Sequence, residues 1–96
     1  MKVLALQTDI YWENPAENFI NISKLLSSYG ACDLIVLPEM FNTGFSMESS
    51  KIAEKVTGDS LKWLKKLAKD RESVVMASLA ISEKSKYFNR LYCVHP

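Results

Sequence analysis

Glu39 is the residue of this sequence best placed to do chemistry. It follows the apolar run Leu-Ile-Val-Leu at 34–37 and Pro38. Such a run is typical of a strand that is buried on both faces, and Pro38 should end it because proline has no amide hydrogen to give to a sheet. Ligand-binding and catalytic groups commonly lie just past the carboxyl ends of such strands. Glu39 is therefore a candidate site residue, and an ordinary solvated loop position is the alternative.

The two cysteines offer thiols, but neither is placed to work with Glu39. Cys32 precedes the strand, so an extended segment of on the order of 15 Å separates it from Glu39. Cys93 and His95 share a strand face, which allows a Cys/His pair or two metal ligands. No third or fourth ligand is evident, so we predict no metal site and expect both cysteines to be buried, unreactive thiols.

The other charged residues are expected to be solvated surface groups. Four lysines crowd one face of a predicted helix, where phosphate binding is the alternative to simple solvation. The rest fall in turns and loops. These surface residues are Lys62, Lys65, Lys66, Lys69, Lys84, Lys86, Glu48, Glu54 and Glu83.

The clearest element near the candidate site is a helix that begins after Asn14. Asn14 can cap it, Pro15 suits its first position, and Glu17 can complete a capping box. An apolar stripe at spacings of three and four follows, and Gly30 is the expected stop. The stripe consists of Phe19, Ile22, Leu25, Leu26 and Tyr29.

Strands are predicted on both sides of this helix. Residues 2–10 form the first, and the run at 34–37 forms the second. A strand, a helix and a strand in this order predict a right-handed unit with two parallel strands. A loop over 40–50 follows, and a short helix is predicted over 51–56.

The last third of the sequence predicts a helix and a hairpin. The helix begins at Asp59 or Ser60 and runs to about Arg71, with its leucines on one face. Two further strands should pair in the antiparallel sense across a polar turn. The strands are predicted over 74–80 and 87–94, and the turn over 83–86.

Composition restricts the class of protein. The 96 residues are 48% hydrophobic and 24% charged, with a formal net charge of +1. These values fit part of one globular domain, with no second domain and no reason to expect nucleic acid or a membrane as partner. We expect a cytoplasmic protein. Because two helices cannot cover both faces of the predicted sheet, we expect residues 1–96 to be the incomplete, amino-terminal part of a domain.

Three stretches resemble the nitrilase superfamily of carbon–nitrogen hydrolases, and they occur in the family's order. Glu39 with the following Met-Phe-Asn-Thr-Gly-Phe-Ser-Met is similar to the family's first catalytic motif, and most similar to that of the ω-amidase-like branch. Residues 3–18 look like its first strand and helix entry. Residues 87–92, Tyr-Phe-Asn-Arg-Leu-Tyr, resemble its Tyr-Asn-Arg strand, although the residues themselves suggest no role for Asn89 or Arg90.

The resemblance implies an α/β fold, the amino-terminal part of the nitrilase-type α-β-β-α sandwich, with a mixed sheet and β-α-β-α-β-β order. It also implies that Glu39 is the general base of a Glu-Lys-Cys mechanism, which needs neither a metal nor an organic cofactor. The family's lysine and cysteine motifs have no match in this sequence. A homodimer is a further expectation for the complete protein.

The expected substrate is a small ω-amide of a keto or amino acid. Phe41, Thr43 and Phe45 are candidate substrate-binding residues, because aromatic rings and hydroxyls suit a small polar amide. The alternative is that the aromatic side chains pack the loop onto the sheet.

Three hypotheses about function remain open at this point. The first is an amidase of which this chain carries only the base, so that the chain alone is inactive. The second is a truncated or degenerate, non-catalytic domain that binds a small amide or a partner protein. The third is a generic α/β domain in which Glu39 has no role.

Overall fold

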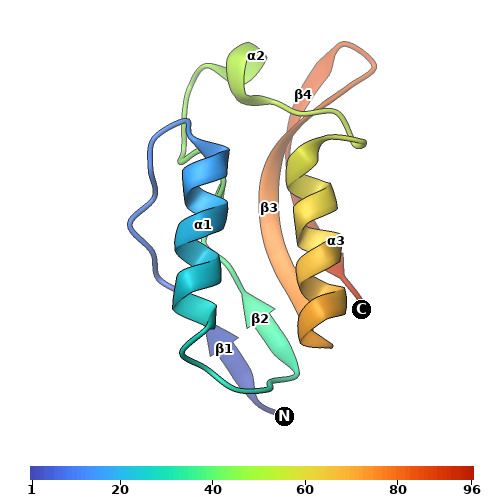
Figure 1. The fold of residues 1–96 in the computed structure, drawn as a ribbon. Helices are drawn as coiled ribbons and strands as arrows, with labels where there is room; N and C mark the ends of the chain where they lie inside the picture. Colours follow the sequence, from blue (N-terminus) through green and yellow to red (C-terminus); the bar gives the residue numbers. More distant parts are fainter.

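A four-stranded mixed sheet with helices on one face forms the structure (Figure 1). The computed structural model describes all residues, Met1 to Pro96. The predicted order of elements is confirmed. The elements are β1 (Val3–Ala5), α1 (Pro15–Leu26), β2 (Leu34–Val36), α2 (Ser49–Ile52), α3 (Asp59–Arg71), β3 (Val74–Glu83) and β4 (Lys86–Val94).

The strands lie in the order β1-β2-β3-β4. β1 pairs with β2, and β2 with β3, in the parallel sense, whereas β3 and β4 are antiparallel. The predicted parallel pair and the predicted hairpin are therefore both confirmed. The hairpin is longer than expected, because pairing continues to Glu83 and Lys86. Only Lys84 and Ser85 form the loop, and both have positive φ, as in the two-residue turns that match strand twist.

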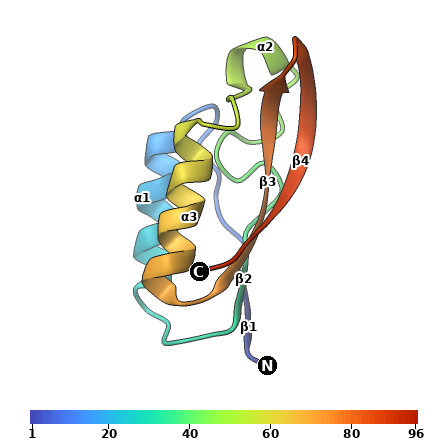
Figure 2. The ribbon, with the colours of Figure 1, turned by 90° about the vertical axis from the view of Figure 1, so that its right-hand side faces the viewer.

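Helices α1 and α3 cover the same face of the sheet (Figure 2). Alternate strand residues point into this layer and are fully buried, among them Ile35, Val75 and Ile81. On the other face, Val36 and Met76 remain half-buried because no helix covers them. The expectation that the strand at 34–37 is buried on both faces is therefore not met in these 96 residues.

Helix α1 begins as predicted and ends earlier than predicted. The Asn14 side chain accepts a hydrogen bond from the Glu17 amide, and Pro15 takes the first position. The helix ends at Leu26 instead of Gly30. Arg71 of α3 accounts for this end, because its guanidinium donates to the carbonyl oxygens of Leu26, Tyr29 and Gly30.

Glu54 is not the free surface charge that the sequence suggested. Its Oε1 accepts a hydrogen bond from the Ser60 amide at 2.8 Å, and its Oε2 accepts one from the Ser60 hydroxyl. The carboxylate thus caps α3, whose own N-cap residue, Gly58, has no side chain to do so. The Glu54 backbone also bonds to Ala80 and Ser82 of β3. This pairing ends α2 at Ile52, before the predicted residue 56.

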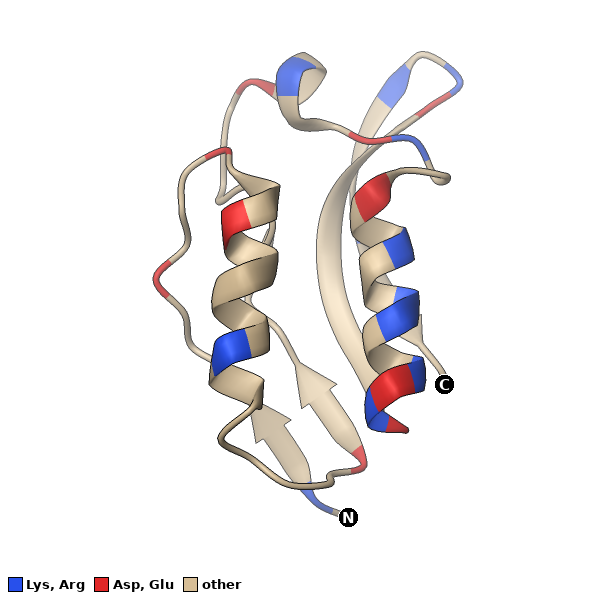
Figure 3. Cartoon of the chain, viewed as in Figure 1, with Lys and Arg blue, Asp and Glu red and all other residues tan.

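Charged residues are frequent along α3 (Figure 3). The four lysines predicted to be solvated, Lys62, Lys65, Lys66 and Lys69, are all exposed. Strands β1 and β2 carry no charged residue, and β3 carries only Glu83 at its end. No helix in the structure has the length and apolar character needed to span a membrane.

Candidate functional site

Glu39 lies two residues beyond Leu37, just past the carboxyl end of β2, where it borders a pocket of about 390 Å³. The lining of this pocket is mostly apolar and includes Val36 and Met76, which lie on the sheet face away from α1 and α3. Met76 and Ser78 of β3 and Leu91 of β4 contribute to that lining. A carboxylate at the edge of such a pocket can exchange a proton with a bound molecule.

The backbone turns sharply immediately after Glu39. Met40 has φ +52°, in the left-handed region that a residue with a side chain adopts at a cost of about 1–3 kcal/mol. The Met40 amide donates to the buried Ser78 hydroxyl at 2.9 Å, and the Met40 carbonyl accepts from the amides of Thr43 and Gly44. These bonds hold the turn and so determine where Glu39 projects.

The side chain of Glu39 is held by Asn89 of β4. Asn89 Nδ2 donates a hydrogen bond to Glu39 Oε1 at 2.9 Å. No role for Asn89 could be predicted from local sequence patterns, because the contact joins residues 50 positions apart. The hairpin register gives a partial signal, since Asn89 pairs with Ala80, four residues beyond the Met76 that pairs with the last residue of β2.

Two of the three predicted substrate-binding residues are buried in the core. Phe41 has no exposed surface and stacks on Trp63, with ring centroids 5.7 Å apart. Thr43 is 2% exposed, and its hydroxyl donates to the carbonyl of Gly44. A side chain without exposed surface cannot contact a ligand in this conformation. Phe41 therefore packs the loop onto the core, and a substrate-binding role for Phe41 or Thr43 stays a prediction.

Phe45 is the predicted binding residue that does border a pocket. It is 63% exposed and lines a second pocket, of about 180 Å³, next to the first. Met40 and Met47 contribute from the same loop, and Tyr87 contributes from β4. Asn89 lines both pockets and so joins them.

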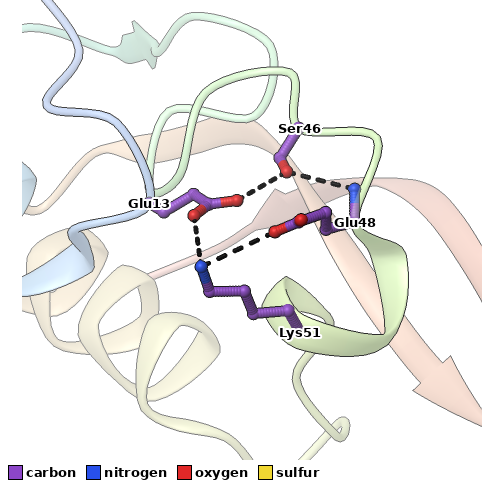
Figure 4. A network of polar contacts seen from close by, with 4 residues as sticks. All are labelled: Glu13, Ser46, Glu48 and Lys51. Carbon is purple, nitrogen blue, oxygen red and sulfur yellow. Dashed lines mark hydrogen bonds and ion pairs between the residues drawn. The ribbon is translucent and has the colours of Figure 1, made fainter.

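The loop that carries Phe45 is fixed by the polar network in Figure 4, which consists of Glu13, Ser46, Glu48 and Lys51. The Glu13 carboxylate accepts two hydrogen bonds. Its Oε2 accepts from the Ser46 hydroxyl at 2.7 Å, and its Oε1 accepts from Lys51 Nζ at 2.8 Å. The Glu13 side chain is only 15% exposed. These bonds, above all that from Lys51, lower the pKa of Glu13, and Glu13 in turn raises the pKa of Lys51.

Glu13→Gln is expected to destabilise the full-length protein most at neutral pH. The pKa of Glu13 lies below its usual 4.5, so the stability it adds is present above that pH and is lost as pH falls through the lowered pKa. The pKa of Lys51 lies above its usual 10.5, so its share is lost only as pH rises through the raised pKa. The effect is measured as the Tm of wild type and of Glu13→Gln, from acidic pH, where Glu13 is protonated, to neutral pH. A difference in Tm that does not change with pH would contradict it.

Neither cysteine borders the pocket beside Glu39. Cys32 is buried, as predicted, and lies before the start of β2. Its Sγ is 3.7 Å from the Ser73 hydroxyl. Cys93 is exposed, so the prediction of a buried thiol is wrong for this residue. The cause is its place on β4, an edge strand, where it pairs with Met76 and so shares the sheet face on which Met76 is only half-buried.

The sequence of this chain matches a known protein family. The family described as "Carbon-nitrogen hydrolase" matches residues 2–96. Omega-amidase YafV of Yersinia enterocolitica is 31% identical over 96 residues, which are 100% of this chain and 37% of that protein. The 2-oxoglutaramate amidase of Bacillus subtilis (strain 168) is 29% identical over 93 residues, which are 94% of this chain and 36% of that protein.

Solved structures show the same fold. The CN-hydrolase superfamily protein XC1258 from Xanthomonas campestris matches with a TM-score of 0.92 and 29% identity, over 99% of this chain and 36% of its own. Nit3 of Saccharomyces cerevisiae, a member of the nitrilase superfamily, matches in fold with a TM-score of 0.75 at 18% identity, over 99% of this chain and 40% of its own. The chain thus spans little more than a third of the length of these relatives. The match to the family covers 95 of the 96 residues, from 2 to 96, and the chain belongs to the carbon–nitrogen hydrolase family.

Proposed function

We propose that this chain supplies the general base, Glu39, of an amidase that hydrolyses the ω-amide of a small keto or amino acid. The observation that carries the proposal is the placement of the Glu39 carboxylate. It borders a pocket at the end of β2 and accepts a hydrogen bond from Asn89, while Ser78 accepts one from the amide of the next residue, Met40. The relatives named omega-amidase and 2-oxoglutaramate amidase support the substrate class.

The proposed reaction begins with proton transfer to Glu39. A cysteine thiol gives its proton to the ionised carboxylate, and the sulfur attacks the amide carbon. A lysine ammonium stabilises the charge that develops on the amide oxygen. The carbon–nitrogen bond then breaks, and the nitrogen leaves as ammonia with the proton that Glu39 held.

Hydrolysis of the resulting thioester completes the cycle. Glu39 takes a proton from a water molecule, whose oxygen attacks the thioester carbon. The carbon–sulfur bond breaks, and the proton returns to the sulfur. The overall change is one amide and one water to one carboxylic acid and one ammonia. Thiol, carboxylate and ammonium suffice for these steps, so the proposal includes no metal or cofactor.

The thiol and the ammonium are proposed to come from a part of the full-length protein other than residues 1–96. No cysteine and no lysine lines the pocket beside Glu39. Cys32 is buried at the opposite end of β2, and the α3 lysines lie on the opposite side of the sheet. Residues 1–96 alone are therefore expected to be inactive.

The proposed substrate places its amide group beside Glu39 and the rest of the molecule toward the second pocket. That pocket combines apolar walls from Met40 and Phe45 with the polar residues Ser49 and Tyr87. A short chain with a polar end suits this mixture.

Release of ammonia tests the proposed function. Full-length protein incubated with 2-oxoglutaramate is expected to release ammonia in proportion to enzyme concentration, and acetamide serves as the comparison that lacks the keto-acid end. Failure to release ammonia from any ω-amide, together with binding detected by calorimetry, would instead support a non-catalytic domain that binds small amides.

A further inference from the structure

We infer that Asn89 is a positioning residue, which holds the Glu39 carboxylate in the orientation that proton transfer requires. The inference rests on the proposed function, because it assigns Asn89 a task only if Glu39 is the base. The contact behind it is the hydrogen bond from Asn89 Nδ2 to Glu39 Oε1, 2.9 Å long. A hydrogen bond to a carboxylate is stronger than one between neutral groups.

The two oxygens of the Glu39 carboxylate have different surroundings. Oε1 accepts the bond from Asn89, whereas the structure shows no hydrogen bond to Oε2. With Oε1 occupied, rotation about the last side-chain bond is restricted, and Oε2 is the oxygen free to take a proton. A general base works only within hydrogen-bond reach of the proton it removes, so this restriction has a direct consequence for rate.

Ser78 holds the backbone of the same turn from the neighbouring strand. Its hydroxyl accepts the Met40 amide at 2.9 Å, while Asn89 binds the preceding residue's side chain. Ser78 faces Leu91 across the hairpin, two residues along β4 from Asn89. The β3–β4 hairpin thus holds the Glu39 side chain through Asn89 and the backbone of the next residue, Met40, through Ser78.

The residue type at position 89 fits a positioning role better than a packing role. Asparagine is disfavoured in strands, yet Asn89 lies in the middle of β4, with Phe88 before it and Leu91 soon after. Asn89 is exposed on an edge strand and belongs to no core cluster. Its contact with Glu39 is the side-chain bond that accounts for its presence.

The test compares Asn89→Ala and Asn89→Asp with wild type in the full-length protein, using 2-oxoglutaramate. Asn89→Ala is expected to lower kcat roughly ten- to hundredfold, with KM changed by less than about twofold. Asn89→Asp keeps the size but brings a second carboxylate against Glu39, so kcat should fall at least as far. The Tm of both variants should stay within about 2 °C of wild type, because Asn89 is exposed.

Arg90→Met is the matched control. Arg90 is the next residue of β4, and it pairs with Glu83 at 2.8 Å instead of contacting Glu39. This variant should keep kcat and KM within about twofold of wild type. Asn89→Gln keeps the side-chain amide donor but is one methylene group longer. It is expected to recover part of the activity that Asn89→Ala loses.

The outcomes separate this inference from the proposed function. If Glu39→Gln is inactive while both Asn89 variants keep wild-type kcat, Glu39 remains the base and the role of Asn89 is refuted. A parallel fall in kcat and Tm in both variants would show that Asn89 is structural, which also overturns the inference. If Glu39→Gln keeps full activity, the proposed function itself is wrong. Should one Asn89 variant fail to fold, the other decides.

Discussion

Glu39→Gln is expected to lower kcat of the full-length protein on 2-oxoglutaramate by about 10²- to 10⁴-fold. Glutamine keeps the shape of the side chain and can still lie beside Asn89, but its amide cannot accept a proton from a thiol or a water. Because the change affects proton transfer more than substrate contact, KM should change much less than kcat. Steady-state kinetics of ammonia release measure both constants.

Glu17→Gln provides the control for this prediction. Glu17 is an exposed carboxylate in the first turn of α1, remote from the pocket, so its loss should leave kcat within about twofold of wild type. If Glu39→Gln retained more than about a tenth of the wild-type kcat, a general-base role for Glu39 would be untenable.

Asn18→Ala is expected to lower the free energy of unfolding by about 3 kcal/mol. Asn18 is 2% exposed, and its side chain makes three hydrogen bonds. Oδ1 accepts from the Tyr11 amide, and Nδ2 donates to the carbonyl oxygens of Tyr11 and Asn42, each at 2.8 Å. Alanine removes all three bonds and leaves buried backbone groups without partners. Chemical denaturation of the full-length protein measures the loss.

Asn21→Ala is the matched control on the same helix. Asn21 makes one exposed hydrogen bond of 3.5 Å, to the Asp9 carbonyl, so its replacement should cost no more than about 0.5 kcal/mol. Equal losses for the two variants would contradict the importance assigned to Asn18. Since Asn18 ties α1 to the loop after Glu39, Asn18→Ala should also reduce kcat.

Local signals explain why much of the fold could be predicted. The start of α1 depends on Asn14 and Pro15, which act on amides within one turn, and the structure shows the predicted cap. The parallel pairing of β1 and β2 follows from the helix between them. The first strand is shorter than predicted, ending at Ala5 instead of residue 10, although the Leu6 amide still bonds to Val36. The apolar residues between 2 and 10 indicate a strand, but they do not indicate the residue at which it stops pairing with β2.

The parts of the site that were missed depend on contacts between distant segments. Asn89 and Glu39 meet only because the two-residue turn of the hairpin sets the register of β4. Glu54 caps α3 only because its backbone is paired with β3. Phe41 was proposed for substrate contact because an aromatic ring after Glu39 suits a pocket, but the direction of its side chain depends on the left-handed turn at Met40.

The position of Glu39 also bears on the prediction that residues 1–96 are inactive alone. Glu39 and Asn89 line one pocket with Val36 and Met76, on the sheet face away from α1 and α3, whereas the α3 lysines are exposed on the helical layer of the other face. Under the proposed mechanism, a thiol and an ammonium must approach Glu39 on that face before a proton can pass to it. The proposal therefore treats Glu39 and Asn89 as one component of an amide-hydrolysing site.

Ammonia release from 2-oxoglutaramate by three proteins tests the central claim most directly: full-length wild type, full-length Glu39→Gln and residues 1–96 alone. The claim that this chain contributes the general base, and neither the thiol nor the ammonium, predicts turnover by the wild type only. Turnover by Glu39→Gln at the wild-type rate, or any turnover by residues 1–96 alone, would contradict it.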